Sequence, residues 1–300
     1  MKIEEALEIY LHDLMVNQNK AIATVQSYQT DLKQYFNYLH KVEISDMNEI
    51  NHQTIIDYIS EITAVKQPRT VSHALSSIRS FHQFIHIYYP SIIDPSIKIK
   101  TVKPQKQLPK FYTEQELDKL FDSFKDSEID IFQRAIFELL YACGLRVSEL
   151  CQLTFNQINF ENRMLRVLGK GNKERLVPIA KYSLQRIEEY LPIRKKWDKH
   201  HSHYLFINQR GNPISRQYVW SILHKKEQEL GINLNYSPHT IRHTFATDLL
   251  AGGADLRTVQ ELLGHSNIAT TQIYTHIQQK QLHKMYDQFH PRNNQEEEDE

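Results

Sequence analysis

The stretch "SPHTIRHTFATDLLAGG", residues 237–253, carries both the start and the stop signals of a helix. Ser237 suits the N-cap, Pro238 suits the first helical position, and the paired glycines suit the end. His239 and Arg242 stand three positions apart, so the helix places them on one face near its N-terminus. Because a helix N-terminus carries partial positive charge, these two side chains predict an anion-binding site.

Apolar residues of the first ninety positions recur every three or four residues, which predicts a unit of four helices. The pattern stops over 89–110, where "YPSIIDPSIKIKTVKPQKQLPK" contains four prolines and five lysines. Proline disfavours helix and biases the residue before it to extended backbone. We therefore expect a helical N-terminal domain over 1–89 and a basic linker over 90–110.

The chain after the linker has the pattern of a mainly helical domain with one small β-sheet. Its first helix begins at "TEQE", a capping box that starts at Thr113. The segment "RMLRVLGKGNKERLVPIA", residues 163–180, alternates around a glycine-containing turn and predicts a β-hairpin with Lys170 at its bend. Helices are expected over 114–124, 129–142, 147–152, 182–194, 215–230, 255–263 and 268–276. The predicted fold is thus mainly α with a small sheet: an α+β domain over 111–292 follows the helical one, and 293–300 forms an acidic, disordered tail.

Composition limits the class of protein. The 36 basic and 36 acidic residues cancel, so net charge alone does not favour binding of a polyanion. Residues 108–290, however, carry 24 basic and 20 acidic side chains, and the final "EEEDE" adds five negative charges. The sequence has no signal-peptide pattern and no apolar run near the ~18 residues of a membrane span, and its two cysteines are too few for a disulfide framework. We expect a cytoplasmic protein without membrane insertion.

Further polar side chains stand where they could reach a ligand. Arg146 follows a glycine in "ACGLRVSEL", and two arginines such as Arg146 and Arg242 can bind a phosphate through bidentate hydrogen bonds. Lys170 and His265 stand in turns, and Tyr274 supplies a hydroxyl. Each of these alone is more often an ordinary surface or core residue. "HTIRH" has histidines at zinc-helix spacing but no glutamate base, and "GKGNKE" lacks the Walker spacing, so no metal or nucleotide site is predicted.

Four motifs in fixed order change this interpretation: "GLRVSEL", "LGKGNKERLVP", "PHTIRHTFAT" and "LLGHSNIATTQIYTH". Together they resemble the tyrosine recombinase (phage integrase) family, and within it the Xer branch of chromosome dimer resolvases, and the resemblance spans nearly the whole chain. The ending "YDQFHPR" favours the XerD type over the XerC type, whereas the acidic tail departs from the family pattern. The resemblance implies an accessory carboxylate at Glu149 and six catalytic residues: Arg146, Lys170, His239, Arg242, His265 and Tyr274.

The implied reaction is attack of the Tyr274 oxygen on a DNA phosphodiester, which breaks one strand and leaves a covalent 3′-phosphotyrosine. Arg146 and Arg242 would bind the non-bridging oxygens, with His265 as a further donor. Lys170 would protonate the leaving 5′ oxygen, and His239 would assist deprotonation of the tyrosine or donate to the phosphate. A fixed cationic cluster does what a metal does elsewhere, so no cofactor, metal or ATP is expected.

Contacts to DNA are expected outside this cluster as well. Lys173 and Arg175 are predicted to contact phosphates. Arg69 and Arg79 are candidates for groove contacts, with a solvated surface as the alternative for these two. An apolar stripe near the C-terminus either packs on its own domain or docks into a neighbouring subunit, as the resemblance implies. Its members lie at helical spacing: Leu282, Met285, Tyr286 and Phe289.

The expected partners follow from the resemblance: duplex DNA at a recombination site, a tetramer with copies of this chain or a related recombinase, and a septal DNA translocase. Near alternatives are a phage or transposon integrase and, more distantly, a type IB topoisomerase. A non-catalytic architectural DNA-binding protein and a metal-dependent nuclease are the rivals from other classes. The intact set of six catalytic residues argues against the architectural protein.

Overall fold

The computed structural model describes the chain except residues 19, 100–109, 170–173, 233–235, 265–275 and 294–300. It divides into two compact units, Met1–Gln107 and Leu108–Glu300. This division falls inside the predicted linker. The first ten residues of that linker belong to the N-terminal unit, because Ile92 and Ile99 pack into its core and the Pro95 carbonyl lies 3.1 Å from His52 Nδ1.

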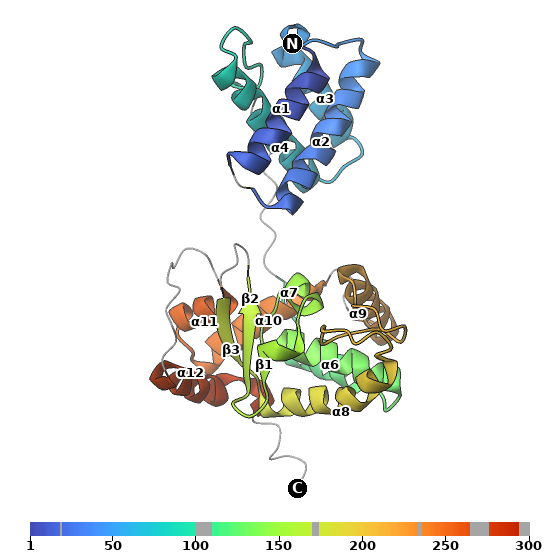
Figure 1. Ribbon diagram of the computed structural model, residues 1–300, viewed down its shortest axis with the longest axis vertical. Helices are drawn as coiled ribbons and strands as arrows, with labels where there is room; N and C mark the ends of the chain where they lie inside the picture. Colours follow the sequence, from blue (N-terminus) through green and yellow to red (C-terminus); the bar gives the residue numbers. More distant parts are fainter. Residues whose placement is uncertain (19, 100–109, 170–173, 233–235, 265–275, 294–300) are drawn as a thin grey trace. The chain divides into compact units, whose positions relative to one another are not determined.

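The N-terminal unit contains the four predicted helices: α1 (Ile3–Val16), α2 (Ile22–Lys41), α3 (His52–Thr63) and α4 (Pro68–Tyr88) (Figure 1). Asn51 forms a capping box at the start of α3, and Pro68 occupies the first turn of α4, where its missing N–H costs no hydrogen bond. Several aromatic rings lie in the core of this unit. The Phe81 ring makes T-shaped contacts with Tyr10 and Phe36, so α1, α2 and α4 share one apolar centre.

The second unit is built from helices around a small sheet (Figure 1). Helix α6 lies at its centre, in contact with α8 and α10. Its second half is apolar apart from Glu138, and all residues from 135 to 142 are buried. The helices are α5 (Glu114–Asp122), α6 (Glu128–Ala142), α7 (Val147–Cys151), α8 (Lys181–Trp197), α9 (Arg216–Leu230), α10 (Pro238–Gly252), α11 (Leu256–Leu263) and α12 (His276–Phe289).

The sheet has three antiparallel strands in the order β1 (Ile158–Asn159), β2 (Met164–Leu168) and β3 (Glu174–Pro178). Strands β2 and β3 form the predicted hairpin, with Leu168 opposite Glu174 and Val167 opposite Arg175. The predicted bend at Lys170 lies outside the described residues. Strand β1 was not predicted, because two residues are too short to display an alternating pattern.

Helix α12 packs against α10 and β3 of its own unit. Leu282 and Tyr286 are buried, and the Tyr286 hydroxyl donates to the Ala142 carbonyl at 2.7 Å. Met285 and Phe289 are half-buried against the same core. Of the two alternatives for the apolar stripe, the structure therefore shows packing within the domain. The predicted helix over 268–276 lies almost entirely outside the described residues.

The last described residues fold back onto α6. The Arg292 guanidinium lies 4.0 Å from the centre of the Phe121 ring, and its Nη2 is 3.3 Å from the Glu138 carboxylate. Over the described part of the chain, no helix is both long and apolar enough to cross a membrane.

Candidate active site: an arginine cluster around Glu149

The site begins at the tight turn between α6 and α7. Gly144 has a φ of +52°, and a Cβ there would come within 2.4 Å of the Phe245 ring on α10. The glycine therefore lets the backbone turn directly over α10. Arg146 follows as the N-cap of α7, where its backbone N–H donates to Glu149 Oε2 and its Nη1 to Oε1, both at 2.8 Å.

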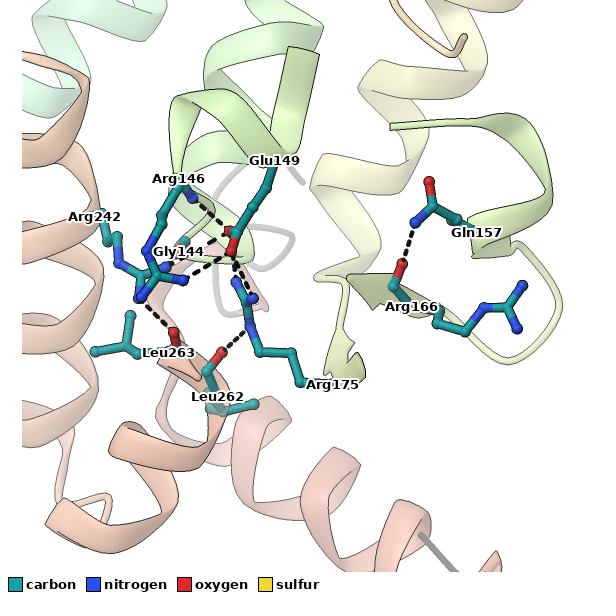
Figure 2. Close-up of polar contacts among 9 residues, drawn as sticks. All are labelled: Gly144, Arg146, Glu149, Gln157, Arg166, Arg175, Arg242, Leu262 and Leu263. Atoms are coloured by element: carbon teal, nitrogen blue, oxygen red, sulfur yellow. Dashed lines mark hydrogen bonds and ion pairs between the residues drawn. The ribbon is translucent and has the colours of Figure 1, made fainter. Parts of the chain in front are cut away.

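Arg175 approaches the same carboxylate from strand β3. Its Nη1 donates to Glu149 Oε1 at 2.9 Å and its Nη2 to Oε2 at 2.8 Å, while its Nε donates to the Leu262 carbonyl at 2.8 Å. Figure 2 shows this bidentate pair and the end of α11 beneath it. Both side chains of the ion pair are only 6% exposed. Arg175 thus joins β3, α7 and α11 inside the protein.

The prediction that Arg175 contacts DNA phosphate is therefore wrong, because the side chain faces inward. On a strand, residues two positions apart share one face, and Val177 on that face is fully buried. This alternation is the sequence signal that could have identified the inward orientation. Lys173, the other predicted phosphate contact on the hairpin, lies outside the described residues.

Arg242 reaches the cluster from α10 and is also buried. It donates through Nη1 to the Gly144 carbonyl and through Nη2 to the Leu263 carbonyl, and Nη1 lies 3.9 Å from Glu149 Oε2. Burial, followed by repulsion from the charges of Arg146 and Arg175, lowers the pKa of Arg242 to about 9. A further anion at this point would relieve that repulsion.

Among the described residues, Glu149 is the single carboxylate paired with these three arginines. Burial alone would raise its pKa, but the hydrogen bonds and charge of Arg175, and then those of Arg146, lower the pKa to about 2. The carboxylate is therefore ionised at neutral pH. One negative charge among three guanidinium groups leaves two positive charges without a partner in the cluster.

Arg146 is the member that an external anion can reach, since its side chain is 33% exposed, against 6% for Arg175 and 10% for Arg242. His239 is exposed on the first turn of α10, one turn before Arg242. The structure thus brings four of the predicted residues to two neighbouring helix starts, α7 and α10: Arg146, Glu149, His239 and Arg242.

The remaining predicted catalytic residues, Lys170, His265 and Tyr274, lie outside the described residues. In the N-terminal unit, Arg69 is exposed and Arg79 is half-buried, both on α4. Their groove contacts stay predictions.

Two family models match the chain. The model of the phage integrase family matches residues 110–281, and that of the phage integrase N-terminal SAM-like domain matches residues 7–86. The chain belongs to the phage integrase family.

Curated relatives of this integrase match along almost their whole length. A tyrosine recombinase XerD of Halalkalibacterium halodurans is 41% identical over 295 residues, which cover 97% of this chain and 99% of the relative. A tyrosine recombinase XerD of Staphylococcus haemolyticus is 37% identical over 294 residues, which cover 97% and 100%. The predicted resemblance to tyrosine recombinases of the Xer branch is confirmed.

A solved structure supports the fold. The XerH site-specific recombinase bound to a palindromic difH substrate superposes with a TM-score of 0.71 over 90% of this chain and 81% of that chain. The sequence identity is 22%, so this likeness concerns the fold.

Proposed function

We propose that this integrase is a site-specific recombinase whose Tyr274 cleaves one strand of duplex DNA and later exchanges it for another. The observation that carries the proposal is the surplus of positive charge around Glu149, which opens to solvent at Arg146. Arg146 and Arg242 would stabilise the negative charge that develops on the non-bridging phosphate oxygens. Because these groups are held in place before the substrate arrives, they need little reorganisation during the reaction.

The proposed cleavage step exchanges one phosphate ester for another. The tyrosine oxygen forms a bond to phosphorus, and the bond from phosphorus to the 5′ oxygen breaks. Lys170 would give a proton to that 5′ oxygen, while His239 would help to remove the tyrosine proton and His265 would donate to the phosphate. A second DNA hydroxyl can reverse the step, because the number of phosphate esters is unchanged.

Duplex DNA is the proposed partner, bound by the lysine-rich linker and Lys173 through phosphates and by Arg69 and Arg79 in a groove. Each phosphate neutralised should contribute about −0.9 to the slope of log affinity against log salt concentration. The proposed role is to resolve chromosome dimers in the cytoplasm, and what supports it is the likeness to relatives named tyrosine recombinase XerD. Such a role calls for a tetramer of copies or of related recombinases on DNA, with a septal DNA translocase as a further partner.

The proposal is tested with a suicide substrate, a duplex that carries the candidate chromosomal recombination site and a nick beside the cleavage point. The full-length protein is incubated with it in EDTA, and covalent adduct is measured on a denaturing gel. We expect an adduct from the wild type and none from Tyr274→Phe. Clear DNA binding without an adduct, even with a related recombinase added, would instead support an architectural protein.

A further inference from the structure

We propose that Arg175 is a positioning residue, which holds Glu149 and the end of α11 in the geometry that the phosphate-binding arginines require. This inference rests on the proposed function of Arg146 and Arg242. Arg175 is too deeply buried to touch DNA, so it would act only through the residues that it contacts.

The first connection runs from Arg175 through Glu149 to Arg146. Each carboxylate oxygen accepts one hydrogen bond from the Arg175 side chain and one from Arg146, through Nη1 at Oε1 and the backbone N–H at Oε2 (Figure 2). Arg146 cannot turn its guanidinium away without losing the hydrogen bond from Nη1 to Glu149. Glu149 in turn cannot rotate without losing the bidentate bond to Arg175, whose planar fork fixes the plane of the carboxylate.

The second connection runs from Arg175 to the end of α11. The last carbonyls of a helix lack intrahelical partners and carry its negative dipole end. Here Arg175 Nε binds the Leu262 carbonyl and Arg242 Nη2 binds the Leu263 carbonyl. Consecutive carbonyls of α11 are thus held by two arginines of the cluster, directly before the segment that carries His265 and Tyr274.

Gly264 provides an independent indication of this close fit. It ends α11 with a φ of +65°, and a Cβ at this position would lie 3.0 Å from Arg175 Cδ. A side chain at 264 would therefore push against Arg175 as well as strain the backbone. The end of α11 and the Arg175 side chain cannot move independently.

Stability alone gives little reason for this buried pair. An apolar pair of similar volume is often as stabilising as a buried ion pair, because removing two charges from water is costly. A bidentate ion pair differs from an apolar contact in fixing orientation. Orientation is what a transition-state donor needs, since a displacement of about 1 Å in the active site can lower a rate ~10²-fold.

The test compares Arg175→Lys with Arg166→Lys in the full-length protein. Arg166 lies on β2 of the same hairpin, exposed, with its guanidinium away from the cluster (Figure 2). Both changes keep the charge. Lysine at 175 cannot bind both carboxylate oxygens and the Leu262 carbonyl together, so we expect its single-turnover rate of adduct formation to fall about 10- to 100-fold. DNA affinity, measured by gel shift, should stay within about threefold, and Arg166→Lys should match the wild type in both.

A double-mutant cycle with Glu149→Gln separates positioning from a general loss of structure. If Arg175 acts through Glu149, the double variant loses less activity than the product of the two single losses. Independent, multiplying effects would contradict the proposal, as would a wild-type rate for Arg175→Lys or an equal loss in Arg166→Lys. Gly264→Ala is the second route if Arg175→Lys folds poorly. It should slow the adduct step with unchanged DNA affinity, and a wild-type rate would again contradict the proposal.

Arg146→Ala distinguishes this inference from the proposed function. If Arg146→Ala cleaves at the wild-type rate, the assignment of Arg146 as a phosphate-binding residue fails. If Arg146→Ala is inactive and Arg175→Lys is fully active, only the positioning role fails.

Discussion

Two glutamates of the second unit, Leu108–Glu300, are each surrounded by arginines, and their environments differ. Glu149 accepts hydrogen bonds on both oxygens, and Arg175, followed by Arg146, lowers its pKa to about 2 against the effect of burial. Glu138 on α6 is fully buried, and burial raises its pKa despite Arg292 and Arg134, whose nitrogens lie 3.3 and 4.0 Å from its Oε1.

The same residue types can therefore form a cluster that is open to an external anion or a closed internal attachment. The Glu149 cluster has an arginine one-third exposed, so its excess charge is available to an anion from outside. The Glu138 cluster is closed over by Arg292, whose guanidinium also covers the Phe121 ring. Its geometry suits attachment of the C-terminal segment to α6.

The largest effect on the rate of adduct formation should come from removing one arginine of the Glu149 cluster. We expect Arg146→Ala to lower the rate of adduct formation about 10²- to 10³-fold, because one preorganised donor to the transition state is lost. Arg134→Ala, the matched change at the Glu138 cluster, should leave the rate within about threefold. Equal losses in the two variants, measured with the nicked substrate, would remove the functional distinction between the clusters.

Removing an arginine from the Glu138 cluster should instead lower the stability of the protein. We expect Arg292→Ala to lower the free energy of unfolding by about 3–5 kcal/mol, because the Glu138 carboxylate stays buried after its ion pair with Arg292 is lost. Arg257→Ala breaks an ion pair whose arginine is 74% exposed. It should change the free energy of unfolding by less than about 1 kcal/mol. Urea unfolding followed by tryptophan fluorescence suits the measurement, since both tryptophans, Trp197 and Trp220, lie in the second unit. A loss below about 1 kcal/mol for Arg292→Ala would show that attachment of the C-terminal segment to α6 contributes little to stability.

The pH dependence of stability should have opposite signs for the two glutamates. The folded pKa of Glu149, about 2, lies below its unfolded value near ~4.3, so its contribution of up to about 3 kcal/mol is present above pH ~4.3 and is lost as the pH falls towards 2. The folded pKa of Glu138 is raised, so its contribution declines as the pH rises above ~4.3.

Comparing Glu149→Gln and Glu138→Gln with the wild type in urea, from pH 3 to 7, isolates each contribution. Glu149→Gln should flatten the loss of stability at the acid end, and Glu138→Gln should remove a decline towards neutral pH. Parallel profiles for the two variants would mean that the carboxylates do not differ in the way their surroundings indicate.

Much of the local structure could be predicted from the sequence. The capping box at Thr113 and the punctuation of 237–253 place the starts of α5 and α10 correctly. The alternation over 163–180 predicts the β2–β3 hairpin, and the ordered motifs predict the family. These signals are local, since caps, turns and periodicity act over one or two turns of chain.

The partners of Arg175, by contrast, were decided by tertiary structure. The alternation with Val177 indicates which face of β3 carries Arg175, but it does not indicate which groups the buried side chain binds. Its partners are 26 residues away at Glu149 and 87 residues away at Leu262. The packing of α12 on its own domain was likewise open, because an apolar stripe specifies burial without specifying the surface that buries it.

The sequence by itself thus determined most of the helices, the β2–β3 hairpin and the family to which the chain belongs, and it predicts which residues carry the chemistry. Tertiary structure alone decided that one carboxylate is shared by arginines from α7, β3 and α10, with one of them left open to solvent. The physical reason is that charge surplus, burial and pKa depend on neighbours brought together by packing, whereas secondary structure depends largely on neighbours along the chain.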